Sequence, residues 1–390
     1  MDQTDIVTEE VRDDILSRGY SRRQLAQIAT IFGVGAAAAT LGKPAWASGG
    51  VPDPAPTAKT RIGANECWTG PLLPGQIAAQ KMVASGNRYS PHDERGDFIK
   101  AVMSVEGVPY DHVAPWPGSS DPLSRSVVTF CSPTRGLVTA DPTFELAGRT
   151  AAWLKVPVKA VPLTPDHRHD VKAMLAADPN AGLYYICTPN NPTGTVTPLA
   201  DIEWLVANKP AGSIVLIDEA YTHFAGVPTA SYLAKANKDV IVMRTFSKIF
   251  GMAGMRMGYV MTRPDTISKL MRYDGGMQSG ALPVPSLACA TASLTSADLI
   301  VARRKQMQEA RAMTLEHLKK RKLLVVGNSD ANMLMIDWKT KPANDMRLAF
   351  RTRSVEIGRN WPIWPTVSRV TVGSMDDMKA FCTALDQIWT

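Results

Sequence analysis

The sequence predicts an α/β fold with a mostly parallel central sheet, helices on both faces of that sheet, and a smaller α+β domain. Short apolar runs alternate with amphipathic stretches, as in repeated β-α-β units. The runs are apolar on both faces, which parallel strands require when helices cover both sides of the sheet. The expected strands lie near 126–130 and 137–141 and at 183–188, 213–219, 239–246 and 257–262.

The chain is long enough for one large or two medium-sized domains. Of its 390 residues, 45% are hydrophobic and 20% are charged, so we expect a large buried core. After about residue 275 a proline-containing segment leads into a long helical pattern at 286–321, followed by short strands in LMIDW and SRVTVG. We therefore expect a large domain at 80–275 and a small C-terminal domain at 276–390, which an N-terminal segment at 48–79 joins.

Residues 1–47 have the layout of a twin-arginine signal peptide. Arg22 and Arg23 follow a long polar lead, and a small-x-small cleavage motif ends at Ala47. The apolar stretch at 25–41 is interrupted by Gly and Thr and is too short for a stable membrane span. We expect export by the twin-arginine machinery, to the periplasm or beyond, with cleavage after Ala47. An uncleaved anchor and a chance arginine pair are the alternatives.

Charge and cysteine content favour neither nucleic acid nor metal as a partner. The net charge of +7 is modest and weakly favours acidic small molecules. The basic run at 317–322 lies in a helical pattern without interleaved aromatic residues, which indicates a solvated helix face. The cysteines are odd in number, widely spaced and without histidines at ligand spacing, so we expect no metal site and no disulfide framework. They are Cys67, Cys131, Cys187, Cys289 and Cys382.

Three of the expected strands end in residues that can perform chemistry. NNPTG at 190–194 follows LYYICTP, Asp218 and Tyr221 close the run SIVLIDEAY, and Lys248 follows DVIVMRTFS. Ligands bind at the carboxyl ends of the strands in an open parallel sheet, so these residues are expected to share one crevice. Each motif alone also fits a structural role, as a turn, a helix cap, a core tyrosine or a solvated lysine.

Together, these motifs resemble the fold type I pyridoxal-phosphate enzymes, specifically the class I/II aminotransferases and most closely their histidinol-phosphate aminotransferase-like branch. The motifs are NPTG, DEAY, and TFSK followed by GMR, and the resemblance runs from RIGANE at 61–66 to RVTVGS at 369–374. It implies pyridoxal 5'-phosphate as cofactor and amino-group transfer between an amino acid and a 2-oxo acid. It also implies a homodimer.

The resemblance implies roles for the residues around the cofactor ring. Lys248 would form a Schiff base with the cofactor and carry a proton from the substrate Cα. Asp218 would pair with the pyridine nitrogen and keep it protonated. Asn191 and Tyr221 match residues that hydrogen-bond the ring 3-oxygen, and Phe144 matches the aromatic residue that stacks on the ring.

The phosphate is expected where a loop enters a helix within 115–128. The N–H groups of Ser119 and Ser120 would meet it at the positive helix end. We expect this helix to begin at Pro122, which lacks an amide donor.

Three further residues are expected at the phosphate. Ser247 would add a hydroxyl and Arg256 a guanidinium fork. Tyr89 matches a tyrosine that reaches the phosphate of the neighbouring subunit, which implies active sites shared across a two-fold dimer.

The substrate end of the site departs from the family pattern. Arg369 matches the arginine that binds the substrate α-carboxylate in two parallel hydrogen bonds, and Asn65 is a further substrate-binding candidate. Arg359 occupies the position where histidinol-phosphate enzymes hold the substrate phosphate, but Trp361 and Trp364 lie beside it here. The retained arginine favours an anionic distal group. An aromatic pocket stiffened by the arginine is the alternative.

The motifs leave the reaction and the substrate open. A lyase, racemase or synthase on the same fold would share these residues. A non-catalytic relative is less favoured, because the lysine is present. Histidinol phosphate is not favoured as the physiological substrate of an exported enzyme, since histidine biosynthesis is cytoplasmic in the family.

Overall fold

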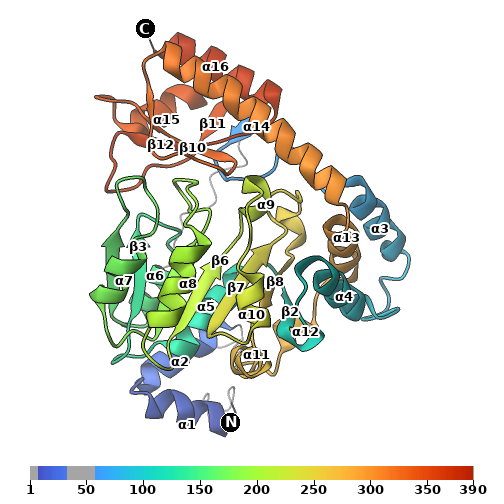
Figure 1. Cartoon of the computed structure of the whole chain (residues 1–390). Helices are drawn as coiled ribbons and strands as arrows, with labels where there is room; N and C mark the ends of the chain where they lie inside the picture. The colour runs from blue at the N-terminus through green and yellow to red at the C-terminus, as the bar shows by residue number, and fades with distance from the viewer. Residues whose placement is uncertain (1–7, 33–57, 390) are drawn as a thin grey trace.

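A seven-stranded sheet forms the centre of the molecule, and a smaller three-stranded sheet lies above it (Figure 1). The structure, a computed structural model, describes residues 8–32 and 58–389. The strand order of the large sheet is β2-β8-β7-β6-β5-β3-β4. Its strands are β2 (Val113–Trp116), β3 (Leu137–Asp141), β4 (Val158–Pro162), β5 (Leu183–Cys187), β6 (Ile214–Asp218), β7 (Val240–Thr245) and β8 (Gly258–Met261).

Strands β3 to β7 run parallel and are covered by helices on both faces, so the predicted α/β class is confirmed. Strands β5, β6 and β7 are buried along their whole length, as their continuous apolar sequences predict. One face packs against α5 (Ser120–Phe130), α6 (Leu146–Trp153) and α11 (Pro264–Met271). The other packs against α4 (Glu94–Glu106), α7 (Val171–Ala177), α8 (Leu199–Asn208) and α10 (Ser231–Lys235).

Two expectations about these strands were wrong. Residues 126–130 form the end of α5, where Ser126 and Thr129 each donate a 2.7 Å hydrogen bond to the carbonyl four residues earlier, in a buried helix. Strand β8 is antiparallel to its neighbours β2 and β7. Only residues 246–257 connect β7 to β8 and they contain no α-helix, so they do not make the crossover that a parallel pair needs.

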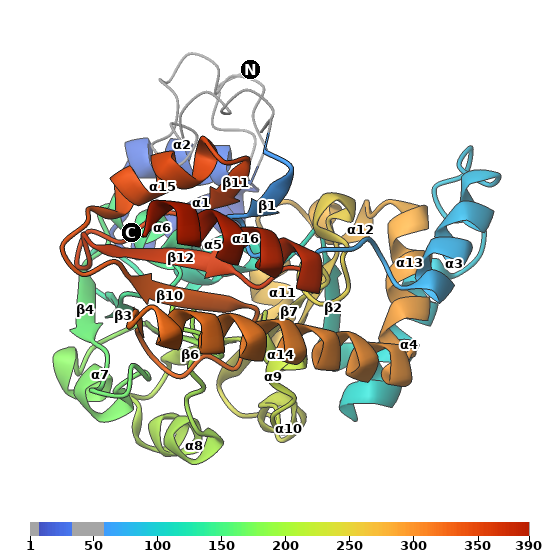
Figure 2. The same cartoon turned by 90° about the horizontal axis from the view of Figure 1, so that it is seen from above.

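The smaller sheet consists of β10 (Met333–Asp337) between antiparallel β9 (Leu324–Val325) and β12 (Val367–Thr371). Helices α14 (Ala297–Lys320), α15 (Ala343–Arg351) and α16 (Met375–Ile388) pack with it (Figure 2). Strand β1 (Thr60–Ile62) pairs in parallel with β11 (Val355–Ile357). The chain before the large sheet therefore lies beside the C-terminal residues.

The long helix expected at 286–321 is two helices, α13 (Val284–Leu294) and α14, which meet at an angle of 81°. At the break, Thr295 donates to the Thr291 carbonyl at 3.2 Å and Ser296 to the Ala292 carbonyl at 2.7 Å. Such side-chain bonds compete with the helical pattern. Over the described residues, no single helix meets the length and hydropathy needed to cross a membrane, and only this bent pair meets them jointly.

Two helices of the predicted signal segment pack on the large sheet's side of the molecule. They are α1 (Glu9–Ser17) and α2 (Arg22–Ile31), and Figure 1 shows them at the end opposite the smaller sheet. Arg22 and Arg23 are exposed in the first turn of α2, after the capping residue Ser21. The cleavage motif at 45–47 lies outside the described residues, so cleavage there stays a prediction.

Candidate active site

A cavity of about 960 Å³ lies at the carboxyl ends of β5, β6 and β7, between the large sheet and residues of the smaller one. It is lined by most of the residues that the sequence indicated: Ser119, Ser120, Phe144, Asn191, Asp218, Tyr221, Ser247, Lys248, Arg256, Arg359 and Arg369. Parallel strands bring their ends to one edge of the sheet, which is why motifs far apart in the chain meet here.

Asp218 is the last residue of β6, and it is buried (3% exposed). Burial raises the pKa of its carboxyl group, while hydrogen bonds from Tyr185 and from the Ala220 N–H oppose that rise. The Tyr185 hydroxyl donates to Oδ2 at 2.9 Å, and the Ala220 N–H donates to Oδ1 at 3.1 Å. A buried carboxylate facing a cavity is suited to a cationic N–H donor such as a protonated pyridine.

The sequence did not identify Tyr185 as a site residue. It lies on β5, next to β6, with its hydroxyl fully buried against Asp218. The one available signal was a polar hydroxyl within the apolar run LYYIC, and a buried tyrosine hydroxyl needs a partner.

Lys248 lies in the turn after β7 and its amine points toward Tyr221. The Nζ atom donates to the Asn65 carbonyl at 3.3 Å and lies 5.3 Å from the centre of the Tyr221 ring. The Asn65 Nδ2 donates to the Tyr221 hydroxyl at 3.1 Å, and Thr371 donates to the Asn65 Oδ1 at 3.0 Å. Asn65 is completely buried and is not among the lining residues, so it supports Lys248 and Tyr221 from behind.

The turn that carries Asn191 is tied to the loop that carries Phe144. Buried Asn190 accepts a 2.7 Å hydrogen bond from Thr143 and donates to the Pro142 carbonyl at 3.2 Å. This arrangement holds the ring of Phe144 and the amide of Asn191 on the same cavity wall.

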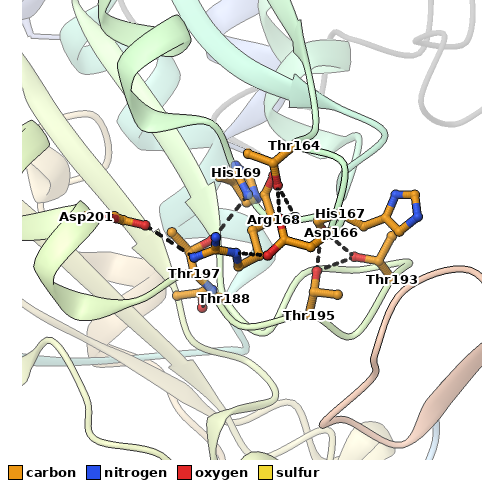
Figure 3. A network of polar contacts seen from close by, with 10 residues as sticks. All are labelled: Thr164, Asp166, His167, Arg168, His169, Thr188, Thr193, Thr195, Thr197 and Asp201. Atoms are coloured by element: carbon orange, nitrogen blue, oxygen red, sulfur yellow. Dashed lines mark hydrogen bonds and ion pairs between the residues drawn. The ribbon is translucent and has the colours of Figure 1, made fainter.

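Threonine side chains form a hydrogen-bond network on the other side of the turn that carries Asn191 (Figure 3). Thr193 and Thr195 share a 2.7 Å hydrogen bond, and Thr195 also donates to the His167 carbonyl. The His169 N–H donates to Thr197 at 3.3 Å, and its Nε2 accepts from the Cys187 N–H at 3.3 Å. Burial lowers the pKa of His169 to about 4, so this ring is neutral at pH 7.

Arg369 on β12 brings a buried positive charge to the cavity. It donates to the Asn191 Oδ1 at 3.0 Å and to the Gly63 carbonyl at 2.8 Å. Burial lowers its pKa, and its buried Nε has no hydrogen-bond partner among the described residues. A guanidinium with unused donor capacity is suited to a carboxylate.

Hydroxyl, guanidinium and amide groups converge at the opposite end of the cavity. Helix α5 begins at Ser120, two residues before the expected Pro122, with Ser119 at the N-cap position. Arg256 donates to Ser247 at 3.4 Å and to the Pro117 carbonyl at 3.5 Å. Gly118 has φ +88°, and a Cβ there would lie 2.5 Å from the Arg256 Nη2. This end fits a phosphate.

Tyr89 does not reach the cavity of its own chain. Its side chain is fully exposed and is absent from the lining residues. It follows α3 (Leu73–Val83), which exposes Leu73, Ile77 and Val83.

At the distal end, Arg359 forms an ion pair with Glu145 and lies over the Trp361 ring, 4.2 Å from its centre. Glu145 directly follows Phe144 and also lines the cavity. Trp364 packs edge-on against His167, with 5.8 Å between ring centres. The sequence did not identify Glu145, because nothing local to DPTFELAG indicates a partner 214 residues away.

The described part of the chain offers no metal centre. Residues 8–32 and 58–389 hold no group of three or more His, Cys, Asp or Glu side chains that could bind a metal ion, and the five cysteines are free.

Comparisons with known proteins agree with this geometry. The family model described as aminotransferase class I and II matches residues 63–385. An aromatic amino acid aminotransferase of Rhodococcus erythropolis is 31% identical over 337 residues, covering 84% of this chain and 89% of that protein. A histidinol-phosphate aminotransferase of Moorella thermoacetica is 29% identical over 334 residues, covering 82% and 83%.

The fold is also similar to solved structures. A histidinol-phosphate aminotransferase from Sinorhizobium meliloti, solved in complex with pyridoxal-5'-phosphate, superposes with a TM-score of 0.77 at 23% identity. The match covers 85% of this chain and 90% of that one.

Proposed function

Because this chain belongs to the class I and II aminotransferase family and is a pyridoxal-phosphate-dependent aminotransferase, we propose that its amino donor is an aromatic amino acid. The observation that carries this proposal is the distal pair of Arg359 and Glu145. The carboxylate neutralises the arginine, and the guanidinium lies over the buried Trp361 ring. A distal cation that already has a carboxylate partner favours a neutral donor side chain over an acidic one, which would meet the charge of Glu145.

The distal pair therefore supports the aromatic alternative over the anionic one. An acidic donor would have to displace Glu145 from Arg359 before it gained a partner. The relative from Rhodococcus erythropolis is named an aromatic amino acid aminotransferase, which supports the same choice.

The residues around the cavity fit the cofactor. The positive end of α5, Ser247 and Arg256 would hold its phosphate, Phe144 would stack on its ring, and Lys248 would bind it covalently. When bound, pyridoxal phosphate supplies a reactive carbonyl and a ring that accepts an electron pair from the substrate.

The protein's own groups would then do the following work. Arg369 binds the substrate α-carboxylate and so orients the Cα–H bond toward the cavity centre. Once the substrate amine has taken its place, the freed Lys248 amine would accept the Cα proton and return one to complete the transfer. Asp218, with the Tyr185 hydroxyl behind it, would hold a positive charge on the ring nitrogen of the bound cofactor. Asn191 and Tyr221 supply hydrogen bonds on the wall shared with Lys248.

Absorbance spectroscopy of the half-reaction tests this proposal. Purified enzyme should convert to the pyridoxamine form with phenylalanine, tyrosine or tryptophan, and more slowly with glutamate or histidinol phosphate. Faster conversion with histidinol phosphate would assign the enzyme to that type instead. Product formation without conversion would favour a lyase, racemase or synthase.

We also propose a homodimer in which Tyr89 completes the neighbouring site. Tyr89 is exposed and outside its own cavity, and α3, which precedes it in the chain, exposes apolar residues, which supports such a contact. Mixed dimers of Lys248→Ala and Tyr89→Ala subunits should recover activity that neither variant has alone. No recovery on mixing would contradict shared sites.

Finally, we propose export by the twin-arginine machinery, to the periplasm or beyond. The exposure of Arg22 and Arg23 supports it, because a receptor reads this pair directly. Replacing both by lysine keeps the charge and should leave the protein in the cytoplasm. Normal export of that variant would mean that another route is used.

A further inference from the structure

Residues 8–32 pack against the end of α5 and against residues that follow α6 and α11. Their apolar side chains form a continuous face that is at most 3% exposed: Val11, Ile15, Tyr20, Leu25, Ile28 and Phe32. These side chains belong to the same hydrophobic cluster as Leu123 and Val127 of α5. Helix α5 carries Ser119 and Ser120 at its N-terminal end, on the cavity wall.

The segment caps the C-terminal end of α5. The Arg18 Nη1 donates to the Val128 carbonyl at 2.8 Å and to the Thr129 carbonyl at 2.9 Å. The Tyr20 hydroxyl donates to the Cys131 carbonyl at 2.9 Å. The last carbonyls of a helix have no partner within it, and a positive charge there opposes the helix dipole favourably.

The segment also covers the ion pairs that hold the first turn of α5. Arg125 is completely buried and donates to Asp121, next to Ser120, at 2.6 Å and to Asp274 at 2.6 Å. The Phe32 ring lies over this guanidinium, 4.5 Å from its carbon to the ring centre. Phe32 also stacks on Tyr273, at 4.7 Å between ring centres. The ring thus keeps water from a buried charge network.

We propose that residues 8–32 are a lasting structural part of the enzyme, and that they position the phosphate end of the site by holding α5 along its length. The proposal rests on the proposed cofactor site. Arg18, Tyr20 and Phe32 act through α5 and are positioning residues. The exposed Arg22 and Arg23 stay accessible while the segment is docked, so docking is compatible with recognition of the pair. The proposal therefore requires that residues 8–32 stay attached, contrary to the cleavage after Ala47 expected from the sequence, which would remove all of these contacts.

The role of residues 8–32 can be tested by measuring how much the phosphate group contributes to cofactor affinity. The apoenzyme is titrated with pyridoxal phosphate and with pyridoxal, which lacks the phosphate. The dissociation constant of pyridoxal phosphate is then divided by that of pyridoxal, and this ratio is compared between variants. Ile28→Asp places a charge in the buried face, and Ala26→Asp places the same charge on the exposed side of α2. Loss of groups that orient metal ligands typically costs 10- to 100-fold in metal affinity, and by analogy Ile28→Asp should weaken pyridoxal phosphate binding by about 10-fold.

Pyridoxal binding should stay within about 2-fold in both variants, and Ala26→Asp should match the wild type for both ligands. Arg18→Met and Phe32→Leu are milder changes that keep the test open if Ile28→Asp does not fold. Both should raise the dissociation constant of pyridoxal phosphate relative to that of pyridoxal, and hydrogen exchange of the amides at 119–131 should become faster.

An unchanged ratio in Arg18→Met and Phe32→Leu would overturn the proposal, as would equal losses for the two ligands. Wild-type enzyme that binds no pyridoxal phosphate would instead contradict the cofactor site itself. The two failures are therefore distinguishable.

Discussion

Changing Glu145 to glutamine should shift donor preference toward acidic amino acids. The variant keeps the size of the side chain and removes the charge that neutralises Arg359. The released guanidinium can then pair with a substrate carboxylate. We expect kcat/KM for glutamate to rise relative to that for phenylalanine.

The size of the shift follows from exposure of the pair. The Arg359 and Glu145 side chains are 44% and 36% exposed, so solvent screens their attraction. Such pairs contribute about 0.2–1 kcal/mol, and the glutamate-to-phenylalanine ratio should therefore rise by no more than about 5-fold. High salt should reduce the effect, because it screens exposed charges.

Steady-state kinetics with both donors measures this ratio. Glu66→Gln is the matched control, since Glu66 lines the same cavity but lies 4.0 Å from Arg61 rather than beside Arg359. An unchanged ratio in Glu145→Gln would refute the reasoning. Arg359→Met supplies a second check: it should impair aromatic donors by removing the cation from Trp361. Loss of glutamate activity alone would show that the distal group is anionic.

Three further predictions concern chemistry and stability. Lys248→Ala should lower turnover by roughly 10³-fold or more, because the covalent and proton-transfer roles are lost together, and borohydride should fix cofactor to the Lys248 peptide of wild type only. Arg244 is buried between Glu219 at 2.8 Å and Glu106 at 3.1 Å, so Arg244→Met should lower the free energy of unfolding by about 3–5 kcal/mol in urea titrations; a loss below about 1 kcal/mol would contradict this. Unfolded His169 binds a proton near pH 6.5 and the folded form only near pH 4, so stability should fall by up to about 3 kcal/mol as pH drops between these values. His169→Gln should weaken that slope, and an identical acid-unfolding profile would argue against a neutral buried ring.

The sequence predicts well which of these residues meet at the cavity, because local order along the chain determines their positions. Asp218 closes its strand, Lys248 lies three residues after the end of β7, and Asn191 lies four residues after the end of β5. A parallel sheet brings these positions together at one edge, irrespective of the conformations of the loops. Tyr185 was not identified as a site residue, because its role depends on which strand lies beside β6. The residues at 126–130 were misassigned because β-branched residues favour strands, while their burial in α5 decided the outcome.

Contacts between distant segments could not be predicted from the same signals. Arg18 reaches a carbonyl 110 residues away, and local analysis of residues 8–32 indicated only an export signal. A twin-arginine motif and an amphipathic docking face can coexist in one helix, because the pair occupies the exposed first turn and the apolar positions face the protein.

The phosphate end and the distal end of the cavity therefore differ in how readily substitutions can change them during evolution. At the phosphate end, the amides of Ser119 and Ser120 come from the backbone of α5, and a substitution alters them only by moving the helix. At the distal end, two side chains from opposite sides of the cavity meet in a half-exposed pair, and either can change without disturbing a buried network. A small loss of stability there can yield a new donor preference, whereas the cofactor end resists change because its buried carboxylate and helix terminus depend on many neighbours.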